Sequence, residues 1–547
     1  MSVLAPLAPL RAHAGRRLTE GLDDATIARL AANHPALQQA IAAAAAEYAL
    51  VRDDVADLLD LDEDGQISAV QEGFINFYAD DAVTPYVALA ARGPWVVTLK
   101  GAVLYDAGGY GMLGFGHTPA AVLDAMARPQ VMANVMTPSL AQRRFDRALR
   151  AEIGHSRGSC PFVRFMCLNS GSEAVGLAAR IVDTNAKLHT DPGARHAGAT
   201  IKRLVVKGSF HGRTDRPGLY SDSSRKTYTK YLASYRDEDS VIAIAPYDVA
   251  ALQRAFDEAT RNHWFIEAVF LEPVMGEGDP GRALPAEFYA AARVLTRTHG
   301  SLLLVDSIQA GLRAHGVLSV VDYPGFEQLD PPDLETYSKA LNAAQYPLSV
   351  LAVNEHAAQV YRKGTYGNTM TTNPRALDVA CATLALFTPQ VRDNIRLRGA
   401  QAIAKLEALQ SELGGLITKV QGTGLLFSCE LASQFKCYGA GSTEEWLRHR
   451  GVNVIHGGEN SLRFTPHFAM DEDELDLLVG LIARALRKAH VRCRPKRRDP
   501  VQMAHRRAYA VCVQPGQMMN LPRATCCVAR HFDRRQRQRR KGQVAFD

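Results

Sequence analysis

The chain has 547 residues, of which 47% are apolar and 22% charged, so a large buried core is expected and wholesale disorder is excluded. No run of about 18 apolar residues is present, so we expect no membrane-spanning helix and no membrane partner. The net charge of +6 is unevenly spread: residues 491–547 hold 15 Lys and Arg against 3 Asp and Glu, which leaves the remainder at −6. Nine cysteines without regular spacing favour a reducing compartment, the cytoplasm, over a disulfide framework.

Residues 1–72 are rich in alanine and carry apolar residues at helical spacing, which predicts a helical N-terminal extension. Within it, residues 60–67 match the first eight positions of a calcium-binding loop, with acids at 1, 3 and 5 and glycine at 6. Position 12 of that pattern is Gln71, where a bidentate glutamate is needed. A solvated acidic turn between helices is therefore favoured over a calcium site.

The middle of the chain alternates between short apolar runs and segments with helical periodicity. Buried strands are expected at 162–168, 204–207, 268–274, 302–306 and 348–353, and helices at 173–187, 249–260 and 286–298. This alternation predicts crossover units and a mostly parallel sheet covered on both faces. A smaller second domain is expected over 376–490, followed by a basic, disordered tail over 491–547.

Four segments carry residues that together suit one cofactor. Small residues at 169–174 follow a strand and open a helix, where backbone N–H groups can bind an anion. Asp306 ends an apolar strand, where a carboxylate needs a cation. Lys339 lies beside small residues, and residues 367–374 form a hydroxyl-rich loop. An anion cradle, a buried acid and a lysine fit pyridoxal 5'-phosphate, which would be held by its phosphate, protonated on its ring nitrogen and joined to the lysine as a Schiff base.

These segments, with three others, resemble the class III aminotransferases, which are fold-type I pyridoxal-phosphate enzymes. The matching segments are 169–174 (N-S-G-S-E-A), 209–214 (S-F-H-G-R-T), 272–278 (E-P-V-M-G-E-G), 306–311 (D-S-I-Q-A-G), 338–340 (S-K-A), 367–374 (G-N-T-M-T-T-N-P) and 462–466 (L-R-F-T-P). The resemblance implies an α/β fold with a mainly parallel seven-stranded sheet in a large domain, 136–375, and a smaller α+β C-terminal domain, 376–490. Residues 73–135 would contribute to the small domain and the active site.

The resemblance also implies roles around the cofactor ring. Lys339 would form the Schiff base and shuttle protons, and Asp306 would pair with the pyridinium nitrogen. Gln309 would hydrogen-bond the 3-oxygen of the ring, and Phe210 would stack on the ring face.

Further roles are implied at the phosphate and the substrate. Gly171 and Ser172 would donate to the phosphate, and Thr369 would reach the same phosphate from a partner subunit, which predicts a homodimer. Arg463 would bind the substrate α-carboxylate through a bidentate fork. Glu277 would pair with this arginine and gate between amino donor and keto acceptor. No metal ion is expected at the site.

Several positions depart from the family pattern. Ser307 stands where the family usually has glutamate, Met275 where it usually has glutamine, and Thr371 and Thr372 replace two glycines. Residues 341–347 follow the lysine in place of a glycine run. None of these changes removes a reacting group, so they indicate a divergent subgroup with an altered pocket.

The reaction implied by the resemblance is a ping-pong transfer of an amino group from an amino acid or diamine, through a terminal amine, to a 2-oxo acid, with 2-oxoglutarate expected. Racemases, aminomutases and decarboxylases share the motifs and remain alternatives. A non-catalytic scaffold that works through the calcium-like loop and the basic tail is a further alternative. Nucleic-acid binding by the tail is not favoured, because its arginines lack interleaved aromatic residues.

Overall fold

The structure is a computed structural model that describes residues 2–132, 135–236 and 239–493. The chain divides into two units, Met1–Cys493 and Arg494–Asp547, and the second unit, which holds most of the expected basic tail, lies outside the described residues. The last described helix, α17 (Glu472–Cys493), continues past the boundary expected at residue 490. Within the described part of the chain, no helix combines the length and apolar character needed to cross a membrane.

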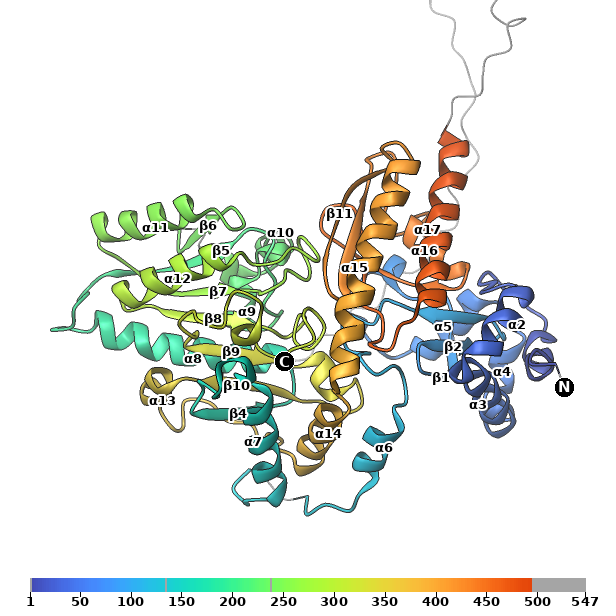
Figure 1. Ribbon diagram of the computed structural model, residues 1–547, viewed down its shortest axis with the longest axis horizontal. Coiled ribbons are helices and arrows are strands. Elements are labelled where there is room, and N and C mark those ends of the chain that lie inside the picture. Colours follow the sequence, from blue (N-terminus) through green and yellow to red (C-terminus); the bar gives the residue numbers. More distant parts are fainter. Residues whose placement is uncertain (1, 133–134, 237–238, 494–547) are drawn as a thin grey trace, which may run out of the picture. The chain divides into compact units, whose positions relative to one another are not determined.

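A seven-stranded sheet forms the centre of the large α/β domain (Figure 1). Its strand order is β4-β10-β9-β8-β7-β5-β6. The strands are β4 (Arg164–Leu168), β5 (Thr200–Val206), β6 (Val241–Ile244), β7 (Trp264–Leu271), β8 (Leu302–Asp306), β9 (Leu334–Tyr337) and β10 (Ser349–Val353). Only β10 runs antiparallel to its neighbours, β4 and β9, while the other pairs are parallel. The expected mainly parallel sheet is confirmed.

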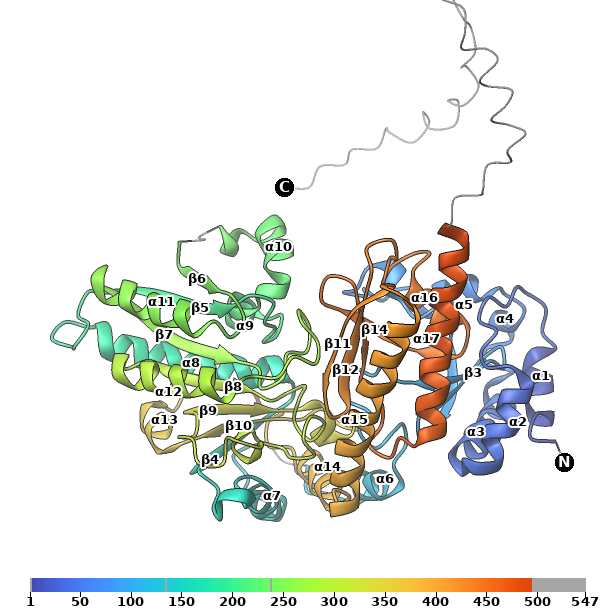
Figure 2. The same ribbon diagram turned by 45° about the horizontal axis from the view of Figure 1, so that its top comes forward.

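Helices cover both faces of this sheet (Figures 1 and 2). The helices of this domain are α7 (Leu140–Glu152), α8 (Gly171–Thr190), α9 (Asp215–Tyr220), α10 (Asp222–Tyr231), α11 (Val249–Arg261), α12 (Ala286–His299), α13 (Glu355–Val360) and α14 (Pro374–Ala385). Alternate residues of a strand face opposite sides: Leu304 of β8 belongs to the apolar cluster formed with α8, and Leu303 belongs to the cluster formed with α11 and α12. Both faces of the sheet are therefore covered by apolar side chains, as a buried parallel sheet requires.

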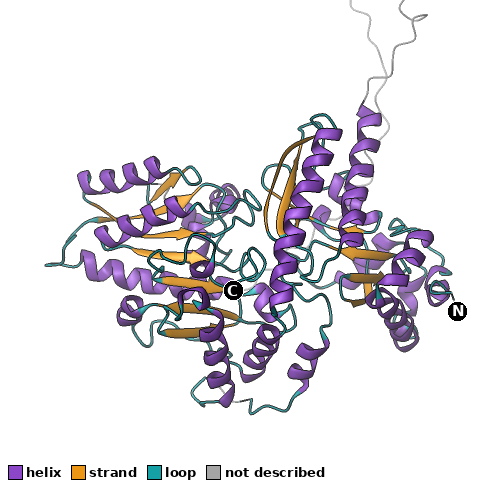
Figure 3. Cartoon of the chain, in the orientation of Figure 1, coloured by secondary structure: helices purple, strands orange, loops and turns teal. Residues whose placement is uncertain are grey.

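Two four-stranded sheets lie outside the large sheet (Figure 3). The first contains β1 (Ala88–Arg92), β2 (Trp95–Thr98), β3 (Val103–Asp106) and β13 (Val452–Asn453), and the second β11 (Ile417–Thr423), β12 (Leu426–Leu431), β15 (Ser461–Phe464) and β14 (Ile455–Gly457). The remaining helices of this part are α6 (Ala120–Ala127), α15 (Pro389–Glu412), α16 (Thr443–His449) and α17. The parallel pairing of β3 with β13 joins the segment near residue 100 to the segment near residue 450.

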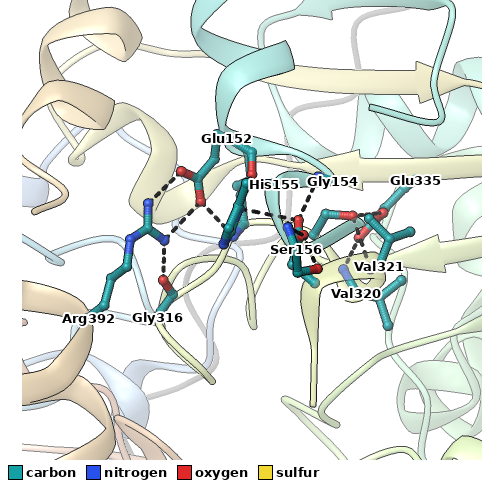
Figure 4. Close-up of polar contacts among 12 residues, drawn as sticks. Glu152, Gly154, His155, Ser156, Gly316, Val320, Val321, Glu335 and Arg392 are labelled. Atoms are coloured by element: carbon teal, nitrogen blue, oxygen red, sulfur yellow. Dashed lines mark hydrogen bonds and ion pairs between the residues drawn. The ribbon is translucent and has the colours of Figure 1, made fainter. Parts of the chain in front are cut away.

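An ion pair ties α15 to the large domain. Arg392 of α15 donates from Nη2 to Oε2 of Glu152, at the end of α7, over 2.6 Å. The same guanidinium donates to the carbonyl of Gly316, as Figure 4 shows. Because one planar group bonds both partners, it fixes the direction of α15 at this point.

The N-terminal residues form α1 (Ala8–Arg11), α2 (Asp24–Asn33), α3 (Pro35–Val51), α4 (Ala56–Leu59) and α5 (Glu63–Gln71). Helix α3 buries Leu37, Ala40, Ile41 and Ala44. These side chains belong to the same apolar cluster as Trp95 and Val97 of β2. The N-terminal helices are therefore part of the core of the first unit.

The acidic segment 60–67 is the start of a helix. Asp62 caps α5 by accepting a hydrogen bond from the amide of Gly65 over 2.8 Å. Asp60 accepts from the amide of Ala14, and Glu63, which is 1% exposed, accepts from the amides of Leu18 and Thr19. A calcium loop needs its carboxylates to converge, whereas these bind separate backbone amides. The segment differs from the expected solvated turn as well, because residues from Glu63 onward are helical and Glu63 is buried.

Candidate active site

A cavity of about 410 Å³ opens beside the carboxyl ends of β8 and β9, where open α/β sheets bind ligands. Five of the residues predicted from the sequence line it: Gly171, Ser172, Phe210, Gln309 and Lys339. The loop after the lysine contributes Asn342 and residues 344–347. The structure therefore brings together segments that are more than 150 residues apart in the chain.

Lys339 is separated from β9 by Ser338 alone and begins a short 3-10 helix, Lys339–Asn342. Its backbone lies in the left-handed region, with φ of 49°. Burial, together with the positive charge of Arg463, lowers the pKa of Lys339 to about 8, although Glu277 and Asp306 act in the opposite direction. A substantial fraction of the amine is therefore neutral near physiological pH, as a nucleophilic lysine requires.

Asp306, at the end of β8, is 3% exposed. Its Oδ2 is 3.0 Å from Nδ1 of His211, and its Oδ1 accepts from the hydroxyl of Thr336 over 3.0 Å. The amide of Ile308 also donates to Oδ1, over 3.2 Å. These bonds hold the carboxylate behind the lining residues of the cavity, close enough for its charge to act on Lys339.

The other end of the cavity is suited to an anion. Helix α8 begins at Gly171, and Ser170 caps it by accepting from the amide of Glu173. A Cβ atom at position 171 would lie 2.8 Å from Cδ1 of Ile308, so any larger residue there would have to displace the Ile308 side chain. The positive end of a long helix then faces the cavity.

Two buried polar atoms support a fit to pyridoxal phosphate. Nε2 of Gln309 and Nε2 of His211 have no hydrogen-bond partner among the described residues, although both residues line the cavity. An unpaired buried donor is costly, and an oxygen of a bound ring would satisfy the amide of Gln309. With the helix N-terminus, the lysine and the buried acid, the residues present fit this cofactor.

Glu272 holds two backbone segments beside the cavity. Its two carboxylate oxygens accept hydrogen bonds from the amides of Phe210 and Gly276, each over 2.9 Å. Burial raises the pKa of Glu272 to about 7. The carboxylate thereby fixes the backbone of Phe210, the residue predicted to stack on the cofactor ring.

Arg463 and Glu277 form an ion pair near Lys339. Nη1 of Arg463 is 2.6 Å from Oε2 of Glu277, and Arg463 also donates to the carbonyl of Gly276. Burial alone would raise the pKa of Glu277, but Arg463 and Lys339 lower it. The guanidinium of Arg463 also lies over the ring of Tyr110, 5.2 Å from its centroid.

Thr369 is the one predicted phosphate ligand that the structure does not bring to the cavity. It is exposed and does not line the cavity of its own chain. The threonine that replaces the second family glycine, Thr372, has a φ of 59°, so the backbone keeps a conformation that favours glycine although the side chain is β-branched.

Sequence reasoning did not assign roles to four residues at or near the site: His211, Glu272, Tyr110 and Arg213. His211, Arg213 and Glu272 lie inside the matching motifs at 209–214 and 272–278, so those motifs could have pointed to them. Tyr110 lies in a glycine-rich segment and carries no signal that distinguishes it. Its segment lies beside that of Arg463, because the amide of Gly111 donates to the hydroxyl of Thr465 and the amide of Thr465 donates to the carbonyl of Ala107.

The serine at 307 bonds a buried carboxylate on the neighbouring strand. Its hydroxyl donates to Oε1 of Glu335 on β9 over 2.6 Å. Glu335 is fully buried and also accepts from the hydroxyl of Ser319 and the amide of Val320, the latter shown in Figure 4. Ser307, which stands where the family usually has glutamate, is thus bonded to a carboxylate on the next strand.

Comparison with known proteins agrees with this architecture. The sequence matches the family model described as Aminotransferase class-III over residues 77–486. The acetylornithine aminotransferase of Neisseria meningitidis serogroup B is 28% identical over 403 residues, which cover 72% of this chain and 92% of that protein. Ornithine aminotransferase 1 of Staphylococcus saprophyticus is 29% identical over 334 residues, covering 59% and 75%. The crystal structure of the ornithine aminotransferase from Toxoplasma gondii ME49 matches with a TM-score of 0.67 at 23% identity, covering 81% of this chain and 99% of that one.

The fold and these comparisons define a pyridoxal-phosphate-dependent enzyme of fold-type I. The chain belongs to the class III aminotransferase family, which confirms the resemblance seen in the sequence. It transfers an amino group from an amino donor to a 2-oxo acid, and pyridoxal 5'-phosphate is its cofactor.

Proposed function

We propose that the enzyme uses Lys339 as its catalytic amine, takes the amino group from the terminal amine of an amino acid or diamine, and passes it to 2-oxoglutarate. The observation that carries the proposal is the grouping of Lys339 with the Arg463–Glu277 ion pair. Both members of that pair influence the pKa of the lysine, and they lie 2.6 Å apart. A reacting amine and a carboxylate-binding group are thus supplied at one site.

Pyridoxal phosphate, when bound, supplies a ring that accepts electrons from the reacting carbon. We assign Asp306 to the ring nitrogen, Gln309 to the ring oxygen and Phe210 to the ring face. Gly171 and Ser172, with the N-terminus of α8, hold the phosphate. Nζ of Lys339 accepts the proton that the reacting carbon of the donor loses, because a neutral amine near pH 8 is a suitable base.

The acceptor is proposed from the charges around Glu277. Its carboxylate lies between two guanidinium groups, at 2.6 Å from Arg463 and 3.9 Å from Arg213. While Glu277 covers Arg463, the pocket suits a donor whose reacting end is an amine without an adjacent carboxylate. A dicarboxylate can pair with both arginines when Glu277 moves aside, which favours 2-oxoglutarate over an acceptor with one carboxylate.

We also propose a homodimer in which Thr369 completes the phosphate site of the partner subunit. The exposure of Thr369 supports this arrangement. Phe74, Ile75 and Phe77 are exposed by 81%, 100% and 72%, and clustered apolar side chains of this kind mark contact surfaces. Sedimentation equilibrium should give the mass of two chains, and Thr369→Val should weaken cofactor binding by about tenfold. A monomeric holoenzyme would contradict the proposal.

The cytoplasm is the proposed compartment. Five cysteines are free thiols in the structure: Cys160, Cys167, Cys381, Cys429 and Cys437. Free thiols suit a reducing compartment.

A donor screen tests the proposed reaction. Holoenzyme is incubated with 2-oxoglutarate and with ornithine, N-acetylornithine, putrescine or alanine, and glutamate is measured. We expect the donors with a terminal amine to give glutamate at least about tenfold faster than alanine, whose only amine is next to its carboxylate. Faster reaction with alanine, or a racemised donor without keto product, would contradict the proposal.

Three variants separate the roles in this screen. Lys339→Ala should form no glutamate, whereas Lys187→Ala, at the exposed end of α8, should react like the wild type. Glu277→Gln uncovers Arg463 and should raise the rate with alanine relative to ornithine by about tenfold. An unchanged ratio would show that Glu277 does not gate the arginine.

A further inference from the structure

Three potential metal ligands converge where the N-terminal helices meet α17, away from the residues that line the cavity. His34 joins α2 to α3, and Asp471 and Glu474 lie at the start of α17. Nδ1 of His34 is 3.5 Å from Oδ2 of Asp471 and 3.8 Å from Oε1 of Glu474. The three ligand atoms all lie within 4.8 Å of one another.

The two carboxylates are oriented by the helix start itself. The amide of Glu474 donates to Oδ1 of Asp471 over 3.0 Å, and the amide of Asp471 donates to Oε2 of Glu474 over 3.1 Å. Nε2 of His467 also bonds Oε2 of Glu474, at 2.8 Å. This reciprocal cap leaves Oδ2 of Asp471 and Oε1 of Glu474 without a hydrogen-bond donor among the described residues, both turned toward His34.

The distances fit a shared ion better than direct pairing. Separations of 3.5 and 3.8 Å exceed the length of an N–H···O hydrogen bond, roughly 2.7–3.2 Å. Nitrogen and oxygen ligands at about 2.1 Å from a tetrahedral zinc ion lie about 3.4 Å from each other. The two distances from Nδ1 of His34 to the carboxylate oxygens are therefore close to the distance between two ligand atoms bound to one ion.

Several buried polar atoms around the three residues also lack a hydrogen-bond partner among the described residues. Nε2 of His34, Nε1 of Trp95 and the hydroxyl of Tyr105 are buried without a hydrogen-bond partner in the described part of the chain. The imidazole packs edge-on against Trp95 at 5.8 Å. The ring of Tyr105 packs edge-on against Trp95 and His467, with ring centroids 5.3 and 6.3 Å apart. A cation here would offset the charge of the Glu474 carboxylate, whose side chain is 3% exposed, and the 46% exposed side chain of Asp471 leaves the site open to water.

We propose that His34, Asp471 and Glu474 bind a divalent transition-metal ion of the zinc class, which joins the α2–α3 junction to the start of α17. One imidazole nitrogen and two carboxylate oxygens suit such an ion, with water completing the coordination. His467 positions Glu474 through its bond to the second oxygen. His34 lies outside residues 77–486, the part matched by the family model, so the site depends on the N-terminal segment.

Zinc binding tests the proposal. Full-length holoenzyme without a polyhistidine tag is stripped with a chelator and titrated with Zn²⁺, and bound zinc per chain is measured by mass spectrometry and calorimetry. We expect the wild type to bind one equivalent more than His34→Phe and Asp471→Asn. Asp471→Asn is the sharper variant, because its amide oxygen still caps α17 while the ligand oxygen is lost. Its affinity should fall at least about 100-fold.

Controls distinguish metal loss from unfolding. His13→Phe removes another histidine of the N-terminal segment that has one carboxylate neighbour, and it should keep the full zinc content. Cofactor absorbance should show that all variants are folded, and only the wild type and His13→Phe should gain thermal stability with zinc. Equal zinc content in the wild type and both site variants, or no zinc in the wild type, would overturn the proposal.

Discussion

At the residue scale, the reactivity of Lys339 depends on its enclosure and on two neighbouring charges of opposite sign. Burial and Arg463 lower the pKa of the amine to about 8, and Glu277 acts against them. The neutral form, which is the nucleophile, therefore increases as the pH rises toward 8 and changes little above it. The amine of an ordinary lysine becomes half neutral only near its unperturbed pKa of about 10.4.

This dependence predicts how fast the apoenzyme captures its cofactor. The rate of reconstitution should rise nearly tenfold per pH unit below about pH 8 and then level off, because it follows the neutral amine. Glu277→Gln removes a negative charge and should move the midpoint to lower pH, whereas Arg463→Gln should move it to higher pH. Stopped-flow absorbance measures the rate, and shifts of the same sign in both variants would contradict this account.

Thr372 is a second residue whose conformation has a measurable consequence. Its φ of 59° costs a β-branched side chain about 1 kcal/mol or more. Thr372→Gly should therefore raise the free energy of unfolding by about 1 kcal/mol in urea. Thr371→Gly is the matched control: φ there is not positive, and the hydroxyl of Thr371 donates to the carbonyl of Asn368, so this variant should be less stable than the wild type.

At the element scale, β8 and β9 position the site together. Asp306 ends β8, Lys339 follows β9, and the two strands pair in parallel with Asp306 opposite Thr336. Glu335 reinforces the pair by receiving the hydroxyls of Ser307 and Ser319. The strand ends that carry the acid and the lysine are thus held in register by a buried carboxyl group whose pKa burial raises to about 7.

Removing this carboxyl group should be costly. Glu335→Val leaves two hydroxyls and the amide of Val320 without their acceptor, which should lower the free energy of unfolding by about 3 kcal/mol. Ser307→Ala removes only one of the three donors and should cost about 1 kcal/mol. Urea unfolding measures both, and equal stability of Glu335→Val and the wild type would show that the network does not hold β8 and β9.

The same elements show what sequence patterns miss. The strand β9 was not predicted, because Glu335 and Thr336 interrupt the apolar run that marks a buried strand. The edge strand β6 was missed because it is short and partly exposed. Strands β4, β5, β7, β8 and β10 were predicted, since their continuous apolar runs are typical of strands buried on both faces.

At the scale of the whole molecule, the N-terminal helices are part of the core. Leu37 and Ile41 of α3 share an apolar cluster with Trp95 of β2. The proposed metal site lies at the junction of α2 with α3. Residues 1–76 precede the segment matched by the family model, so this part of the core is an addition to the family pattern.

The burial of α3 leads to a direct stability test. Leu37→Ala should lower the free energy of unfolding by about 3 kcal/mol, because Leu37 is 0% exposed and its truncation leaves a cavity. Leu50→Ala on the same helix should change it by less than about 0.5 kcal/mol, because Leu50 is 76% exposed. Comparable losses in the two variants would mean that α3 does not pack on β2.

The sequence alone determined the fold class, the family and the cofactor, because these depend on local motifs and on the spacing of apolar runs. It also predicted the candidate site residues, among them Lys339, Asp306 and Arg463, each from its own motif. The tertiary structure alone decided several of the contacts around them: His211 on Asp306, Glu272 on the amide of Phe210, and Glu335 on the hydroxyl of Ser307. Such contacts join residues far apart in the chain, and their distances depend on how strands and helices pack rather than on any local pattern.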